Sequence, residues 1–173
     1  GDAIRVESTN TGAGGAQMDL LHFTTSPADG DNFAMINMGC YYTGTTSVYG
    51  TSIKSIWTDV SARDAALTFS TNNSGTLTEA TRITSAGNVG IGTVSPSNLL
   101  DIKSNGSSKG LDIHHSNGNM VARLIHGGSG DEGQLKLYDS NSETVRIAGE
   151  NNVNSFINSG NVGIGTTSPD GKL

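Results

Sequence analysis

The sequence predicts an all-β protein, and three observations support this prediction. Gly, Ser, Thr and Asn together make up 80 of the 173 residues, whereas residues that favour helices are scarce. Apolar residues recur with period two in short runs, which is typical of half-buried strands. Asn-Gly and Asp-Gly pairs, such as those that begin at 117 and 29, separate these runs as turns. We therefore expect short strands joined by tight turns.

The expected strands follow one another along the chain. Their alternating apolar residues are Leu67/Phe69, Ile83, Val89/Ile91, Ile102, Leu111/Ile113, Leu135/Leu137, Val145/Ile147 and Val162/Ile164. The Gly/Ser-rich stretch at 127–130 is expected to be a loop. A helix is expected only at residues 61–67, SARDAAL, and for one turn at most.

Composition and charge exclude several classes of function. The net charge is −6 and the ten Lys and Arg residues are scattered, so no basic stripe is present to bind nucleic acid. No apolar run is long enough to span a membrane, and no membrane partner is expected. The single cysteine, Cys40, cannot form a disulfide within the chain, and it receives no role.

One segment occurs twice in the chain. Residues 85–100 read SAGNVGIGTVSPSNLL and residues 158–173 read NSGNVGIGTTSPDGKL, with ten of sixteen aligned positions identical. We expect two repeat units, a longer aromatic-containing one at 1–96 and a second at 97–169. Residues 170–173 would then begin a further unit of a longer protein.

The repeated segment is expected to be a structural motif. Its residues are Gly87, Asn88, Val89, Gly90, Ile91, Gly92 and Pro96 in the first copy, and Gly160, Asn161, Val162, Gly163, Ile164, Gly165 and Pro169 in the second. Alternation places Val and Ile on one face of a strand and glycine on the other, where another backbone can approach closely. The prolines favour an extended exit from each strand.

Such a chain cannot easily close a core of its own, because its strands are short and their open edges would aggregate. Three copies wound around a common axis would cover both the edges and the apolar faces. We therefore predict an elongated homotrimeric fibre of short strands, of the triple β-helix or β-prism type, with repeats stacked along the threefold axis. Ile91 and Val162 are expected near that axis.

Candidate catalytic and metal-binding residues are weak. His22, His114, His115 and His126 lack the spacing of metal ligands, and Asp29-Gly30-Asp31-Asn32 fits an ordinary turn. The glycines at 87–92 precede Thr-Val-Ser-Pro rather than a helix, which argues against a phosphate-binding loop. We predict no catalytic residue, no metal site and no cofactor, although a pair of carboxylates brought together by the fold is left open.

Four aromatic residues gather in the first unit: Tyr41, Tyr42, Tyr49 and Trp57. Aromatic residues are favoured in half-buried sheets, so a role in the core is the preferred interpretation. If they lie on the surface instead, they are candidate contacts for a glycan, because flat apolar rings with polar edges stack on sugars.

The segments ATRITSAGNVGIGTVSPSNLLDI at 80–102 and FINSGNVGIGTTSPDGKL at 156–173 resemble the recurring segment of bacteriophage tail fibre and tailspike proteins. The stretch at 62–83 resembles the sequence that commonly precedes it. The resemblance implies an extracellular, virion-borne homotrimeric tail fibre that contacts other tail proteins and supports attachment to the host, with a host surface glycan as a candidate partner. The intramolecular chaperone domain that often follows this segment is absent from these residues.

Two alternatives remain at this point. The first is an enzyme, a phage tailspike that degrades polysaccharide on a triple-stranded β-helix. The second is a trimeric surface adhesin of a bacterium. A structural fibre segment without enzymatic activity is the favoured interpretation.

Overall fold

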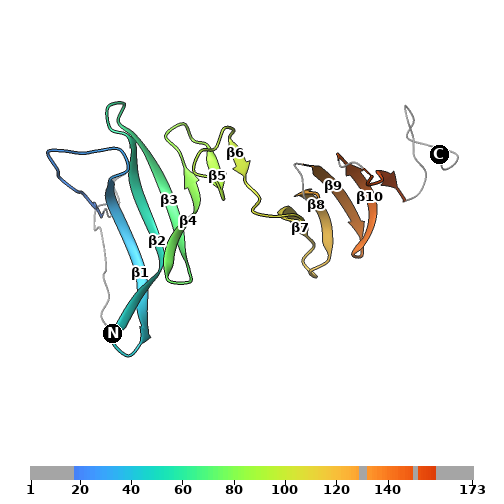
Figure 1. Cartoon of the computed structure of the whole chain (residues 1–173), viewed down its shortest axis with the longest axis horizontal. Helices are drawn as coiled ribbons and strands as arrows, with labels where there is room; N and C mark the ends of the chain where they lie inside the picture. Colours follow the sequence, from blue (N-terminus) through green and yellow to red (C-terminus); the bar gives the residue numbers. More distant parts are fainter. Residues whose placement is uncertain (1–17, 129–131, 150–151, 159–173) are drawn as a thin grey trace, which may run out of the picture. The chain divides into compact units, whose positions relative to one another are not determined.

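The computed structural model describes residues 18–128, 132–149 and 152–158. These residues contain eleven strands and no helix, which confirms the all-β prediction. The strands form two sheets, one of six strands in the order β1 to β6 and one of five strands in the order β11-β10-β9-β8-β7 (Figure 1). The chain divides into two compact units, with the boundary at β5 and β6. The trimer and the repeat boundaries remain predictions.

The first sheet is dominated by an antiparallel meander of four strands. Its strands are β1 (Asn32–Thr43), β2 (Thr46–Asp59), β3 (Asp64–Asn73) and β4 (Thr76–Ile83), followed by the short β5 (Val89–Ile91) and β6 (Leu100–Ile102). Ser74 and Gly75 join β3 to β4 with φ of 52° and 89°. Two consecutive positive φ values are those of the tight hairpin turn whose twist matches that of paired strands.

The helical turn expected at residues 61–67 is wrong. Residues 60–63 form the turn between β2 and β3, and β3 already begins at Asp64. The Asp59 carboxylate accepts hydrogen bonds from the Ser61 hydroxyl and the Ala62 amide, which satisfies the turn without a helix. Arg63 closes the turn with φ of 62°, and the apolar residues that follow alternate between the two faces of the sheet.

The first sheet buries small residues and leaves large apolar ones open. In β3, Thr68 is fully buried, whereas Leu67 and Phe69 are each 38% exposed. Thr68 pairs with Arg82 of β4, so both side chains lie on the same face. The Arg82 guanidinium donates two hydrogen bonds to Glu79, and long side chains held in this way can cover a short neighbour. Leu67 and Phe69 therefore lie on the face opposite this ion pair.

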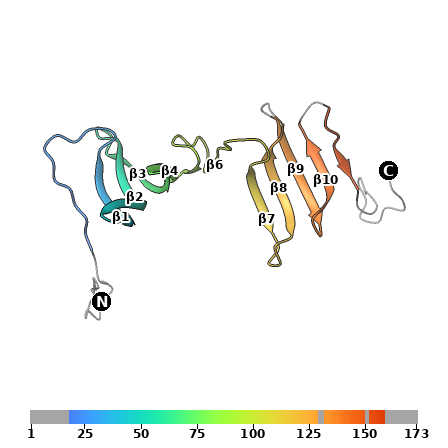
Figure 2. The same cartoon turned by 60° about the horizontal axis from the view of Figure 1, so that its bottom comes forward.

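The second sheet is antiparallel throughout its described pairings (Figure 2). Its strands are β7 (Gly110–His114), β8 (Met120–His126), β9 (Gly133–Asp139), β10 (Ser142–Ala148) and β11 (Phe156–Ile157). Ser140 and Asn141, with φ of 50° and 69°, form the two-residue turn between β9 and β10. The tight turns predicted from the sequence are thus present in both sheets. The short strands predicted with them are found in the second sheet, whereas β1, β2 and β3 of the first sheet are longer than expected, with 12, 14 and 10 residues.

Candidate functional site

One face of the second sheet is lined by aliphatic side chains from all five strands. The register places Leu111 opposite Leu124, Leu124 opposite Leu135 and Leu135 opposite Ile147. The neighbouring row pairs Ala122 with Ile113 and Leu137, Leu137 with Val145, and Val145 with Ile157. We call these nine residues the aliphatic face: Leu111, Ile113, Ala122, Leu124, Leu135, Leu137, Val145, Ile147 and Ile157. The alternation predicted for 111/113, 135/137 and 145/147 places each pair on this one face.

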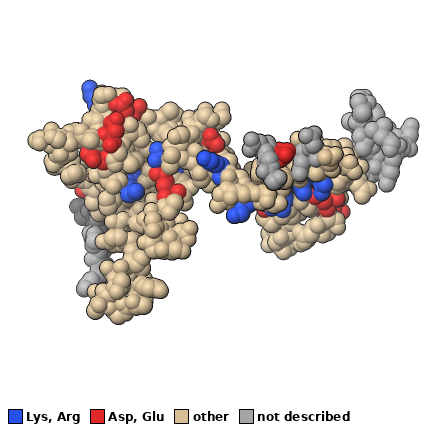
Figure 3. Space-filling model, in the orientation of Figure 1, with Lys and Arg blue, Asp and Glu red and all other residues tan. Residues whose placement is uncertain are grey.

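The opposite face of the same sheet carries the charges, and we call it the ion-paired face. Arg123 donates hydrogen bonds from its guanidinium to both carboxylate oxygens of Asp112, at 2.8 and 3.0 Å. Glu143 bridges Lys136 and Arg146, and the Arg146 guanidinium lies 5.2 Å from the centroid of the Phe156 ring. Figure 3 shows basic and acidic side chains close together over this unit. The sheet therefore separates an ion-paired face from an uncharged one.

The electrostatics of Glu143 follow from this arrangement. Burial alone raises the pKa of the Glu143 carboxyl, but hydrogen bonds and charge from Arg146 and Lys136 outweigh it, so the net pKa lies below its ordinary value. The Asp112 carboxylate correspondingly raises the pKa of Arg123. These pairs stabilise the charged forms of their members, as expected for structural ion pairs.

The first copy of the repeat motif forms a closed turn followed by β5. The Thr84 hydroxyl accepts a hydrogen bond from the Asn88 amide, and Gly87 turns the chain with φ of 81°. The Asn88 side chain then donates to the carbonyl of Pro96 at 3.3 Å, which closes the loop that leaves β5. Asn88 and Pro96 thus act together in the motif. The second copy, Gly160–Pro169, lies outside the described residues.

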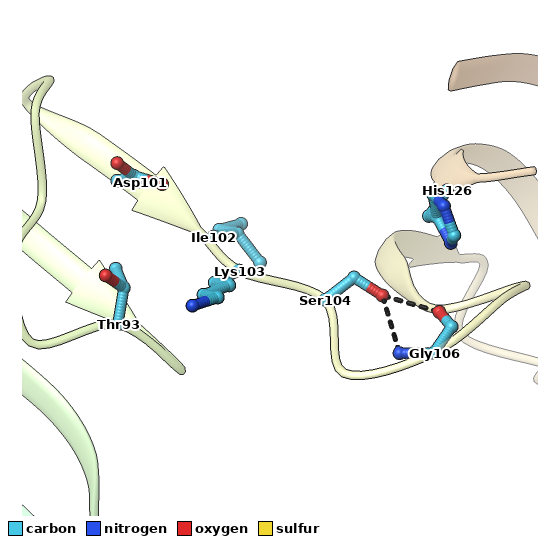
Figure 4. A pocket seen from close by; sticks show the side chains of 7 residues that line it. All are labelled: Thr93, Asp101, Ile102, Lys103, Ser104, Gly106 and His126. Carbon is cyan, nitrogen blue, oxygen red and sulfur yellow. Dashed lines mark hydrogen bonds between the residues drawn. The ribbon is translucent and has the colours of Figure 1, made fainter. Parts of the chain in front are cut away.

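β5 and β6 run in the same direction. Val89 donates its amide to the carbonyl of Leu99, and Lys103 donates to the carbonyl of Ile91, so both strands advance together. The two arrows in Figure 4 point the same way. Gly92 lies at this point with φ of 72°, and a Cβ there would come within 2.6 Å of the Lys103 carbonyl oxygen. The close backbone approach predicted for the motif therefore occurs at Gly92.

An open hollow lies beside β6 in the second unit (Figure 4). It is lined by Thr93, Asp101, Ile102, Lys103, Ser104, Gly106 and His126. The Ser104 hydroxyl donates to the Gly106 carbonyl and accepts from the Gly106 amide, so it belongs to a local turn. We assign no catalytic role to this hollow.

The histidines and the Asp29–Asn32 turn are held by local hydrogen bonds. The His114 ring lies 3.2 Å from the Gly118 carbonyl, and the His115 ring contacts the Asn117 amide at the same distance. Asp29 accepts a hydrogen bond from the Val60 amide, which attaches this turn to the end of β2. Within the described ranges, no three His, Cys, Asp or Glu residues form a group that could hold a metal ion.

The structure separates the aromatic residues singled out in the sequence. Tyr41, Tyr42 and Tyr49 are 71%, 76% and 57% exposed, so they do not form a core within the chain. Tyr49 pairs with Gly39, two residues before Tyr41, which places Tyr41 and Tyr49 on the same face of the hairpin. Their contact with a glycan remains a prediction.

Trp57, by contrast, lies near the other end of β2. It is half-buried, and its ring packs against Phe33 with centroids 4.7 Å apart and an interplanar angle of 36°. The preferred core interpretation therefore describes Trp57 but not the three tyrosines.

The sequence analysis does not identify the aliphatic face. The sequence shows the alternation of its residues within each strand, but it places the predicted contact between chains at Ile91 and Val162. Ile91 is 42% exposed in a strand of three residues, and Val162 lies outside the described residues. Only the strand register shows that alternate residues from five strands form one surface.

Comparison with known proteins adds no relative: no protein-family model matches the chain, and no curated protein sequence matches it. The described residues include no helix long and apolar enough to cross a membrane.

Gly92→Ala is expected to lower the free energy of unfolding by about 1–3 kcal/mol, because Cβ would collide with the Lys103 carbonyl at a left-handed backbone position. Gly106→Ala is the matched control, since open space surrounds Gly106 and its effect should stay within about 0.5 kcal/mol. Urea unfolding of both variants measures the difference. Equal stability of the two would contradict the close approach of β5 and β6.

Trp57→Ala is expected to lower the free energy of unfolding by about 1–3 kcal/mol, because it removes the packing on Phe33. Tyr41→Ala should change it by less than about 0.5 kcal/mol, since that ring is largely exposed. Thermal unfolding at one fixed protein concentration compares the two variants. A larger loss for Tyr41→Ala would show that Tyr41 is covered in the native protein.

Glu143→Gln is expected to lower the free energy of unfolding at pH 7 by about 1 kcal/mol. The pKa of Glu143 is lowered in the folded chain. The ionised carboxylate therefore stabilises the folded state at a pH above its ordinary pKa, and this stabilisation is lost as the pH falls through the pKa of the folded chain. Urea unfolding between pH 7 and pH 3 should therefore show the difference from the wild type shrinking at acid pH. Asp139→Asn, at the β9–β10 turn, is the control, and an equal pH dependence there would contradict the assignment.

Proposed function

We propose that the chain is a structural segment of a homotrimeric bacteriophage tail fibre, which supports attachment to the host. The repeated GNVGIGT segment supports the tail-fibre assignment through its resemblance to such proteins. The all-β architecture is consistent with it. The proposed location is the extracellular part of the virion, in contact with other tail proteins.

The observation that carries the proposal is that the apolar side chains of the chain are not covered. Ala66 and Ile125 are the only hydrophobic residues that are buried within the described ranges, whereas a domain of this size normally buries most of its apolar surface. Large aliphatic side chains of both sheets are 38–58% exposed. Such a chain needs further polypeptide around it to form a stable structure.

Assembly of identical copies provides this cover without a second gene product. Three copies related by a threefold axis would form a closed arrangement in which every copy has the same environment. Repeat units would then continue the same packing along the axis, which gives a long and stiff rod. In that rod the exposed Tyr41 and Tyr49 are candidate contacts for a host surface glycan.

The native mass of the full chain tests the proposal. Native mass spectrometry is expected to show about 53 kDa, three times the 17.8 kDa of one chain. Antibodies against the chain should label the tail of the parent particle in electron micrographs and reduce its adsorption to cells. A monomer at micromolar concentration, or labelling away from the tail, would contradict the proposal.

A further inference from the structure

The large side chains of the aliphatic face are open to solvent. The most exposed are Leu111 at 44%, Ile113 at 51%, Leu124 at 57%, Leu135 at 39%, Leu137 at 41%, Ile147 at 58% and Ile157 at 57%. They come from five adjacent strands and form one continuous surface rather than scattered sites. A contiguous apolar surface of this kind marks a site of protein association.

The second unit contains nothing that covers this surface among its described residues. Its five strands form a single sheet, with no second layer packed against it. A single sheet with one apolar face is not stable by itself in water, since sheets are normally packed against another layer. The covering layer must therefore come from outside this sheet.

We propose that this layer is the same aliphatic face of other copies of the chain, an inference that rests on the proposed homotrimeric fibre. None of the nine residues of the aliphatic face is ionisable, and the two ionisable residues in line with them, His126 and Asp139, lie at the ends of β8 and β9. The central part of the face can therefore meet its own copies without repulsion between like charges. The faces are also chemically complementary to themselves, because aliphatic side chains pack well on aliphatic side chains. The exposed parts of the seven large side chains amount to several hundred Å², on the scale of the roughly 800 Å² per partner typical of stable complexes.

The ion-paired face is less suited to this contact. Arg123 is held by Asp112, and Glu143 is held by Lys136 and Arg146. Burying these groups between copies would remove water from charges that are already paired within their own sheet. This face is therefore the one that we assign to solvent in the assembly.

The proposed contact also differs from one made through the repeat motif alone. In β5, Ile91 is 42% exposed, and the strand has three residues. The aliphatic face offers seven such side chains between the two motif copies. The inter-chain core is accordingly assigned to the second sheet, which lies between the two motif copies in the sequence.

A matched pair of substitutions on the neighbouring strands β7 and β8 tests which face is used. Leu124 is 57% exposed on the aliphatic face, and His114 is exposed on the other face, two residues after Asp112. We expect Leu124→Asp to raise the dissociation constant of the full-length assembly at least 100-fold, and His114→Asp to change it less than 5-fold. Analytical ultracentrifugation gives the constants, and circular dichroism checks that the variants remain folded.

The outcomes separate this inference from the proposed fibre. Dissociation by His114→Asp but not by Leu124→Asp would place the interface on the other face, which overturns the inference and leaves the trimeric fibre standing. An intact assembly in both variants would also overturn it. A wild-type monomer would overturn both proposals, since it would mean that the chain covers the face with its own residues.

A second measurement does not depend on a buried charge. In a Cys40→Ser background, Leu124→Cys and His114→Cys introduce one thiol on each face. We expect maleimide to modify the first at least 10-fold more slowly than the second in the assembly, and at similar rates after dilution to monomer. Equal rates in the assembly would overturn the inference, and so would protection at position 124 that persists in the monomer.

Discussion

The structure depends on one constraint: a sheet in a single layer has two faces, and only a polar face can remain in water without a large free-energy penalty. In the second sheet the charged groups of one face are paired within the sheet, Arg123 with Asp112, and Glu143 with Lys136 and Arg146. In the first sheet Arg82 pairs with Glu79, whereas the buried hydroxyls of Ser52 and Thr68 have no hydrogen-bond partner among the described residues. The apolar side chains are left open, with Leu124 and Ile147 more than half exposed. The association that we propose would follow from this imbalance, because the hydrophobic effect acts on whatever apolar area remains uncovered.

The first sheet shows the same division with different residues. Its buried positions are short, as in Ser52, Thr68 and Ala66, and its ion pair between Glu79 and Arg82 lies on that side. The larger Leu67 and Phe69 point to the other side and remain partly open. Both sheets thus place their ion pairs on one face and large, partly exposed apolar side chains on the other, although Ile56 and Ile125 lie on the side of the ion pairs.

The repeat motif has a different task from the sheets. The Asn88 side chain closes the loop to Pro96, and Gly92 allows the backbone to pass close to Lys103. The chain turns back between β1, β2, β3 and β4, but it winds forward from β5 to β6. A forward step with such a short connection leaves little room for variation. This gives Asn88, Gly92 and Pro96 of the first copy a physical role.

The sequence by itself determined the all-β class, the tight turns and the alternation of residues such as 111/113 and 135/137, because these depend on local backbone preferences and on the period of two. The helical turn predicted at residues 61–67 is wrong, because the Asp59 carboxylate closes a turn at residues 60–63 that leads directly into β3. The tertiary structure decided that the tyrosines are exposed while Trp57 packs on Phe33. It also decided that the aliphatic residues of five strands form one surface. Both the exposure of these aromatic residues and the formation of this surface depend on how the strands pair. The register of that pairing is not a local property of the chain, so it cannot be read from the sequence of one strand.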